Sequence, residues 1–284
     1  MWWLVMMSCS DGSEPVKKLQ EAVAQGCNGH EVLCDRPLDQ VTLAGTHNSM
    51  ANADAEWIAP NQQHGLTRQL EDGIRALMLD TMEWNGEPYL CHGYCELGNQ
   101  PLAEGLGEIE DFLAAHPQEV VLIIFQDGIS VETTVSVMDE VGLSDRAWAW
   151  DGSTPLPTLR ELIEASTPLV VTAESKGPPP AWYHHAWNLI TDTPYDFSDP
   201  SEYSCERLRG EDSNPLFLVN HWIGNPLPSE ENGIEANATD ALLERVQRCG
   251  EERDRMVNIV AVDFYNHGGL FPVVDELNGI QPAL

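Results

Sequence analysis

The sequence predicts an α/β fold, a (β/α)8 TIM-type barrel in either a regular or a distorted, incomplete form. Two observations support this prediction. Short apolar runs alternate with amphipathic segments along the chain, and polar residues follow directly after most of the apolar runs. Such alternation is typical of a parallel sheet covered by helices. The chain has 284 residues, and one barrel of roughly 250 residues accounts for nearly all of it. We therefore predict a single barrel over residues 27–284, preceded by a lead-in at 1–26.

The apolar runs that predict the eight strands are residues 41–44, 76–80, 88–91, 120–125, 169–173, 187–190, 217–220 and 259–263. The fourth run, Val-Val-Leu-Ile-Ile-Phe, contains no polar residue. This is expected of a parallel strand that is covered on both faces. The sixth run is the weakest of the eight.

Helices are predicted between these strands at residues 66–73, 101–116, 131–141, 159–165 and 239–249. The first ends at Gly73, and glycine commonly terminates helices. The second has one apolar stripe at helical spacing, formed by Leu102, Leu106, Ile109 and Leu113.

The charge of the chain limits its partners. Lysine and arginine total 14 against 46 aspartates and glutamates, which gives a formal net charge of −32. Such a surface repels nucleic acid and anionic bilayers at long range. We therefore expect no nucleic-acid partner. We also expect a monomeric chain. Solubility or a salty habitat is the simplest explanation of the acidity.

Six of the seven cysteines fall into local or medium-range pairs, namely Cys27 with Cys34, Cys91 with Cys95, and Cys205 with Cys249. Three disulfides would indicate an oxidising compartment. Zinc binding is the alternative for the second pair, but it would use the intervening His92 as a ligand.

The seventh cysteine, Cys9, follows a brief apolar stretch at residues 1–7. This pattern resembles the end of a bacterial lipoprotein signal, in which Cys9 would be lipidated. A hydrophobic terminus without any targeting role is the alternative. No apolar run approaches the ~18 residues that a membrane span needs. We expect a secreted or cell-envelope-anchored protein.

Polar residues gather where the predicted strands end. They are His47, Asn48, Asp80, His92, Gln126, Asp127, Glu174, Lys176, His221 and Asp263. In a barrel these positions open into one mouth, which is where active sites of this fold form. Two histidines facing one another suit phosphodiester cleavage, because one can accept a proton while the other supplies one.

Three motifs carry a resemblance to a known family: Gly-Thr-His-Asn-Ser at 45–49, Gly-Ile-Arg-Ala-Leu-Met-Leu-Asp at 73–80 and Cys-His-Gly-Tyr at 91–94. In this order they resemble the X-region of phosphatidylinositol-specific phospholipase C and its secreted bacterial relatives. The resemblance is strongest over residues 27–130 and continues to Val-Asp-Phe-Tyr at 262–265. It implies an incomplete or distorted barrel that cleaves the diester of a phosphoinositide. Because a net charge of −32 opposes docking on an anionic membrane, a phospholipid and a soluble phosphodiester both remain open as the substrate, with peripheral contact to a membrane.

The resemblance also implies roles for three residues. His47 matches the general base that removes the proton of the inositol 2-hydroxyl. His92 matches the general acid that protonates the departing diacylglycerol oxygen, which leaves a cyclic inositol phosphate. Asp263 resembles the carboxylate that orients the first histidine.

A calcium site is implied by the same comparison. Simple bacterial members use an arginine on the second strand, whereas calcium-dependent members have an acidic pair there. This chain has Met78 and Asp80 at those places. We expect Ca²⁺ held by Asn48, Asp80, Gln126 and Asp127, because hard cations prefer oxygen ligands. Glu83, Asp127 and Glu174 are open alternatives for the acidic ligands that Met78 and Gln126 replace.

Three further residues are substrate-binding candidates. Lys176 follows the fifth strand, where metal-dependent relatives have phosphate-binding lysines. Arg75 precedes the second strand and is either a phosphate ligand or a member of a structural salt bridge. Tyr265 ends the last motif of the resemblance.

Other functions stay open. A glycerophosphodiester phosphodiesterase or a sphingomyelin-type phosphodiesterase would share the barrel and a similar histidine pair. An inactive surface lipoprotein that binds inositol or glycans is the alternative from a different class.

Overall fold

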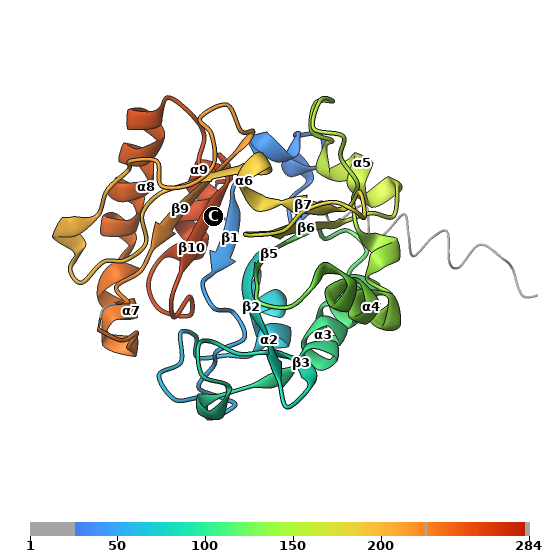
Figure 1. The fold of residues 1–284 in the computed structure, drawn as a ribbon. Helices are drawn as coiled ribbons and strands as arrows, with labels where there is room; N and C mark the ends of the chain where they lie inside the picture. The colour runs from blue at the N-terminus through green and yellow to red at the C-terminus, as the bar shows by residue number, and fades with distance from the viewer. Residues whose placement is uncertain (1–25, 225, 282–284) are drawn as a thin grey trace, which may run out of the picture.

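The computed structural model describes residues 26–224 and 226–281 (Figure 1). Within them, eight parallel strands form one curled sheet in the order β7-β6-β5-β2-β1-β10-β9-β8. The strands are β1 (Leu43–Thr46), β2 (Ala76–Trp84), β5 (Val121–Asp127), β6 (Leu169–Ala173), β7 (Tyr183–His185), β8 (Ile190–Asp192), β9 (Leu216–His221) and β10 (Ile259–Val262). In this part of the chain β7 and β8 do not pair, so the sheet stays open between them. The predicted barrel is confirmed in its incomplete form.

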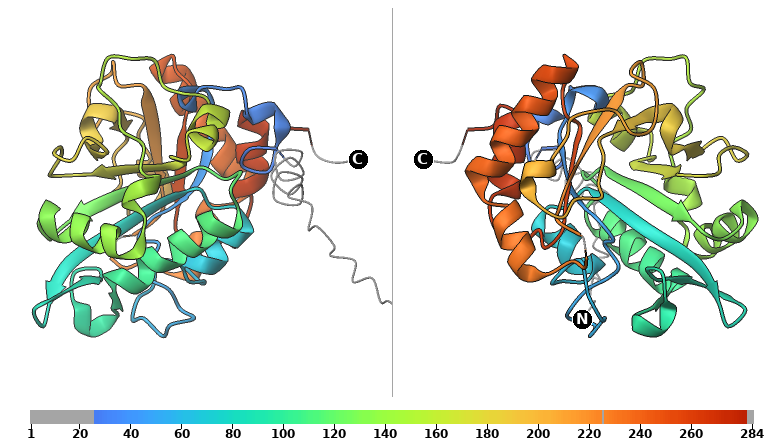
Figure 2. Two further views of the ribbon diagram at one scale, coloured as in Figure 1. Left: turned by 90° about the vertical axis from the view of Figure 1, so that its right-hand side faces the viewer. Right: turned by 60° about the vertical axis from the view of Figure 1, so that its left-hand side comes forward.

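The longer helices are α2 (Leu66–Asp72), α3 (Leu102–Ala115), α4 (Val131–Val141), α5 (Leu159–Glu164), α7 (Glu230–Ala236), α8 (Thr239–Arg253) and α9 (Leu270–Leu277). The views of Figures 1 and 2 show α2, α3 and α4 outside one half of the curled sheet, beside β2 and β5, and α7, α8 and α9 outside the other half, beside β9 and β10. The five predicted helices are confirmed as α2, α3, α4, α5 and α8. In the described residues no helix is both long and apolar enough to cross a bilayer.

The predicted third barrel strand is wrong. Residues Glu87–Leu90 form β3, which runs antiparallel to β2 and pairs on its other side with β4 (Gln100–Pro101). A tight turn joins β2 to β3 at Asn85 and Gly86, whose φ angles are 54° and 85°. Residue pairs of this kind favour two-residue hairpin turns. An apolar run alone does not distinguish a barrel strand from the arm of a hairpin.

The predicted sixth strand is also corrected. Residues Ala186–Leu189 form a short helix, α6, and β8 begins only at Ile190. The parallel sheet contains β7 as a strand that was not predicted; it pairs with β6 and has the sequence Tyr-His-His. A three-residue strand with two histidines has no apolar pattern, so periodicity could not predict it.

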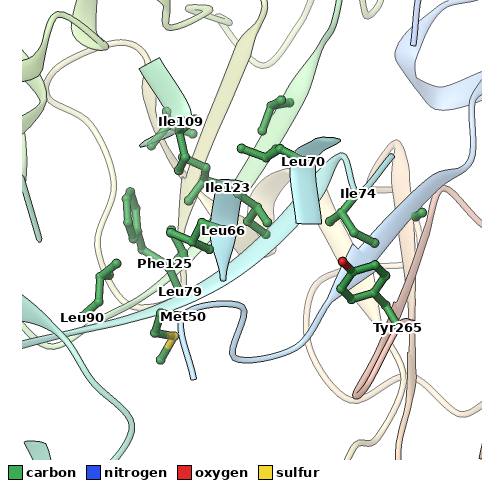
Figure 3. Close-up of a cluster of buried hydrophobic side chains, with 14 of the residues drawn as sticks. Met50, Leu66, Leu70, Ile74, Leu79, Leu90, Ile109, Ile123, Phe125 and Tyr265 are labelled. Carbon is green, nitrogen blue, oxygen red and sulfur yellow. The ribbon is translucent and has the colours of Figure 1, made fainter. Parts of the chain in front are cut away.

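The hydrophobic core lies on both faces of the sheet, as the apolar run of β5 predicted. Ile123 and Phe125 of β5 pack in one cluster with residues of α2 and α3, including Leu66 and Ile109 (Figure 3). Their neighbours Leu122 and Ile124 belong to a second cluster. The alternation fixes the register of β5 because a shift by one residue would exchange the two faces.

The three predicted cysteine pairs are disulfides in the structure: Cys27–Cys34, Cys91–Cys95 and Cys205–Cys249. The last ties the segment before β9 to α8. Three disulfides indicate an extracellular or otherwise oxidising environment. Cys9 and the rest of the predicted lead-in up to residue 25 lie outside the described residues.

Arg75 lies just before β2, at the opposite end of the barrel from the strand exits. Its Nε donates to Glu119 Oε2 at 2.7 Å, and its Nη1 donates to the carbonyls of Leu70 and Ile74. The two side chains of the ion pair are only 12% and 6% exposed. The structure therefore gives Arg75 the structural role that the sequence left open.

We expect Arg75→Ala to lower the free energy of unfolding by about 3–5 kcal/mol, because it leaves the buried Glu119 carboxylate without its cation. Urea denaturation followed by circular dichroism measures this change. Arg68→Ala is the matched control: it removes the exposed pair with Asp72, and we expect a loss of less than about 1 kcal/mol. Equal losses in the two variants would contradict the prediction.

Candidate active site

A pocket opens at the carboxyl ends of the strands. The residues that line it are His47, Asn48, Met78, Asp80, His92, Ile124, Gln126, Glu174, Tyr195, Arg209 and Trp222. Five barrel strands contribute to this lining at or near their carboxyl ends: β1, β2, β5, β6 and β9. The structure thus brings together His47, Asn48, Asp80, His92 and Gln126 of the predicted site.

His47 follows β1 and is held on two sides. Its Nδ1 donates to Asp263 Oδ1 at 2.9 Å, and Asp263 directly follows β10. The indole ring of Trp222 stacks on the imidazole with ring centroids 3.9 Å apart and an angle of 5° between the planes. Among the described residues the second nitrogen, Nε2, has no hydrogen-bond partner. The ring is therefore oriented as a proton acceptor.

His92 reaches the same mouth by way of the hairpin. Because β3 runs back along β2, the amide of Cys91 donates to the carbonyl of Asp80, at the level where the pocket begins. The disulfide Cys91–Cys95 then closes the loop around His92. The imidazole rings of His47 and His92 lie edge to face across the pocket, with centroids 6.4 Å apart and an angle of 71° between their planes.

Asn48 contacts the Nδ1 atom of His92 through its side-chain amide. Its backbone is in the left-handed region with a φ of 44°, a conformation that asparagine tolerates better than most residues. This places its amide Nδ2 2.7 Å from His92 Nδ1. Burial, together with the nearby His47, lowers the pKa of His92, while Asp263 partly opposes the change. His92 is therefore held in its neutral form more strongly than an exposed histidine.

Two carboxylates face the pocket. Burial raises the pKa of Asp80 to about 7, against an opposing effect of His47. Burial also raises the pKa of Glu174, although Arg209 lowers it. In the described part of the chain no donor reaches the Asp80 side chain. Asp80 is therefore the carboxylate of the pocket without a hydrogen-bond donor or a cation beside it among the described residues, whereas Glu174 has Arg209.

Arg209 is the cation of the pocket, and no motif or pattern in the sequence predicted it. It comes from the long connection between β8 and β9. Its guanidinium pairs with Asp192 and with Glu174 Oε1 at 3.0 Å, and it stacks on the ring of Trp187. Tyr195, also not predicted, lies 4.9 Å from the same guanidinium.

Five predicted site residues do not line the pocket, although one of them, Asp263, contacts His47 there. Lys176 Nζ donates to Asp127 Oδ2 at 3.0 Å, and the side chain of Asp127 is fully buried by this contact and by the amide of Ser175. Tyr265 donates its hydroxyl hydrogen to Asp72 at 2.8 Å. Arg75 is at the far end of the barrel, as described above. The remaining mouth histidine, His221, is fully buried against the carbonyl of Ala236.

The donor set of the pocket fits a hard divalent cation. Asp80 offers an unpartnered carboxylate, and Asn48 and Gln126 offer amide oxygens beside it. Among residues 26–224 and 226–281, no three histidine, cysteine or acidic side chains cluster to hold a metal. Any ion would therefore depend on the amide oxygens, which suit Ca²⁺ or Mg²⁺ rather than zinc.

Comparison with known proteins identifies the family of this chain. The family model described as PI-PLC X 1 matches residues 33–278. The chain belongs to the PI-PLC X family. A PI-PLC X domain-containing protein of Arabidopsis thaliana is 27% identical over 270 residues, which cover 86% of this chain and 63% of that protein. PI-PLC X domain-containing protein 1 of Arthroderma benhamiae is 27% identical, covering 89% and 90% of the two chains.

Solved structures show the same PI-PLC fold. The phosphatidylinositol-specific phospholipase C of Listeria monocytogenes superposes with a TM-score of 0.59 at 15% identity, covering 88% of this chain and 96% of that chain. A Staphylococcus aureus enzyme of the same name, studied for its membrane binding, also gives 0.59 at 15% identity, with 88% and 95% covered. Both confirm the incomplete TIM-type barrel.

The raised pKa of Asp80 predicts how the free energy of unfolding changes with pH. Between about pH 4 and pH 7 the folded protein keeps a proton on Asp80 that the unfolded chain has already lost, so this group lowers stability as the pH rises. In EDTA, we expect Asp80→Asn to be more stable than the wild type by a few kcal/mol above about pH 7. The difference should disappear below about pH 4. Urea denaturation across this range measures it.

Glu83→Gln is the control for this experiment, because Glu83 is an exposed carboxylate on the same strand. Its stability should follow that of the wild type at every pH. If Asp80→Asn also followed the wild type, the buried, unpartnered state of Asp80 would be disproved.

Proposed function

We propose that this chain is a phosphodiesterase that cleaves phosphatidylinositol-type lipids into a cyclic inositol phosphate and diacylglycerol. The observation that carries the proposal is a pair of histidines in one pocket, each held by a hydrogen bond at Nδ1. Asp263 holds His47, and Asn48 holds His92. The PI-PLC fold supports a phosphodiesterase in general. The head group, the residue roles and the metal are part of the proposal.

In the proposed reaction, His47 Nε2 removes the proton of the inositol 2-hydroxyl. The oxygen attacks phosphorus, and the bond from phosphorus to the diacylglycerol oxygen breaks. His92 supplies the proton that this oxygen takes up. Asp263 stabilises the imidazolium that forms on His47, because its carboxylate accepts the Nδ1 hydrogen throughout.

Asp80, Asn48 and Gln126 would hold the divalent cation, with Ca²⁺ as our choice. When bound, such an ion neutralises phosphate charge and acidifies a hydroxyl near it. Without it, the pocket has two carboxylates and one arginine that is already paired with Glu174 and Asp192. This excess of negative charge is the reason that a diester anion needs a further cation here.

Access to lipid is supported by an exposed apolar group beside His92, which we call the rim and define as Ile58, Tyr94 and Leu97. Their exposed fractions are 63%, 73% and 42%, and the amide of Ile58 donates to the carbonyl of Leu97. The exposed acids Glu56 and Glu96 flank them. An apolar rim with acidic flanks favours contact with a zwitterionic rather than an anionic surface.

A secreted location is part of the proposal. The three disulfides favour it, and one relative, 26% identical over 300 residues, is an uncharacterised secreted protein of Arthroderma benhamiae. Lipidation at Cys9 remains a prediction from the sequence.

We expect the wild type to release cyclic inositol phosphate from phosphatidylinositol in Ca²⁺, and much less in EDTA. His47→Ala and His92→Ala should each lower the rate roughly 100- to 10,000-fold, the usual effect of losing a general base or acid. Phosphate-specific chromatography measures the product. Circular dichroism should show that both variants are folded.

Each part of the proposal has its own contrary outcome. Indifference to EDTA would refute the metal. Faster turnover of glycerophosphocholine or sphingomyelin than of phosphatidylinositol would favour the alternative phosphodiesterases. The absence of product from the wild type and both variants on all three substrates would favour an inactive binding protein.

We expect Tyr94→Ser with Leu97→Ser to slow hydrolysis in phosphatidylcholine vesicles that contain phosphatidylinositol, while a soluble short-chain substrate is hydrolysed at the wild-type rate. The rim would lose apolar area that contacts the bilayer, but the pocket would be unchanged. Val32→Ser is the control, since Val32 is 53% exposed in a segment next to the start of β5, away from the mouth. Equal slowing on both substrates would contradict the role of the rim.

A further inference from the structure

Asn61 is buried outside the pocket lining, and its side chain contacts Asp263, the partner of His47, and Asn48, the partner of His92. It lies between β1 and α2 and is 1% exposed. Its backbone is fixed on both sides, since its amide donates to the carbonyl of Ala51 and its carbonyl accepts from Phe264. The side chain is therefore held in place independently of any ligand in the pocket.

Asp263 determines how the Asn61 amide is turned. Asn61 Nδ2 lies 3.1 Å from each oxygen of the Asp263 carboxylate. A carboxylate oxygen accepts hydrogen bonds, so the amide nitrogen must face it and the amide oxygen must face away. The reverse orientation would place the Asn61 oxygen against two carboxylate oxygens. Asn61 Nδ2 is also 3.4 Å from His47 Nδ1, but both are donors there because Nδ1 donates to Asp263.

The orientation of the Asn61 amide in turn determines the orientation of the Asn48 amide. The oxygen Oδ1 of Asn61 accepts from Asn48 Nδ2 at 3.2 Å. The same nitrogen of Asn48 lies 2.7 Å from His92 Nδ1. Since Asn48 presents hydrogens to that position, the neutral imidazole of His92 must accept at Nδ1 and carry its own hydrogen on Nε2.

We propose that Asn61 is a positioning residue that couples the two histidines and gives them opposite tautomers. Neutral His47 carries its hydrogen on Nδ1, towards Asp263, and presents an unprotonated Nε2. Neutral His92 carries its hydrogen on Nε2 and presents it to the pocket. The importance of this arrangement for catalysis rests on the proposed function, because one nitrogen must accept a proton and the other must supply one.

The coupling runs in one direction, from Asp263 through Asn61 and Asn48 to His92. If Asn61 were absent, nothing among the contacts of Asn48 would require its nitrogen to face His92. The Asn48 amide could then turn and present Oδ1, and His92 would carry its hydrogen on Nδ1 instead. The geometry at His47 would not change, since it depends directly on Asp263.

The experiment measures the tautomers by two-bond ¹H–¹⁵N correlation NMR on histidine-labelled full-length protein in EDTA, at a pH where both rings are neutral. Spectra of His47→Gln and His92→Gln assign the two rings. We expect the wild type to show a protonated Nδ1 on His47 and a protonated Nε2 on His92. In Asn61→Ala and Asn61→Ser, the His92 signals should change towards the Nδ1 tautomer while those of His47 stay.

Asn52→Ala is the matched control. Asn52 is a buried asparagine of the same segment, and its side chain bonds to Met50 and Ala55 rather than to the histidine network. We expect wild-type tautomers in this variant. If the Asn61 variants do not fold, Asn48→Asp tests the last step, since a carboxylate must accept from His92 Nδ1 and reverse its tautomer.

A protonated Nδ1 on His92 in the wild type would overturn the proposal without any variant. Unchanged His92 signals in folded Asn61 variants would also overturn it. Because the tautomers are read without substrate, a failed activity assay with the expected tautomers would count against the proposed function alone.

Discussion

The site depends on the parallel pairing of β1 with β10, in which Thr46 lies opposite Val262. This register brings the next residue of each strand, His47 and Asp263, into contact across 216 positions of sequence. A shift by one residue would turn one of the two side chains away from the mouth. The amide of Gln62 reinforces the junction, because its Nε2 donates to the carbonyls of both His47 and Val262.

The pocket and the chain as a whole both carry an excess of acidic groups. A protein with a net charge of −32 that also lines its pocket with Asp80 and Glu174 is poorly suited to an anionic diester by itself. Arg209 compensates within the wall, where Glu174 and Asp192 already hold it. The unpartnered Asp80 is therefore the feature on which the proposed cation depends.

Sequence reasoning predicted the incomplete barrel, five helices and the three disulfides, and it predicted that His47 and His92 would meet in one pocket, whereas their chemical roles stay part of the proposal. Each of these predictions has a local signal, such as an uninterrupted apolar run, a helical stripe or a histidine after a strand. It failed where pairing partners decide the structure: the run ending at Leu90 forms a hairpin with β2, and β7 has no apolar pattern. Arg209 and Asn61 were missed because their roles come from contacts with Asp192, Glu174 and Asp263, which are distant in sequence.

The stack of Trp222 on His47 has an optical consequence. The imidazole can quench the emission of an indole in face-to-face contact at 3.9 Å, and a protonated imidazole quenches tryptophan more strongly than a neutral one. The chain has nine tryptophans, so the part of the emission that is lost in Trp222→Phe would report the charge on His47. The ionisation of His47 could then be followed in the resting protein, with no substrate present.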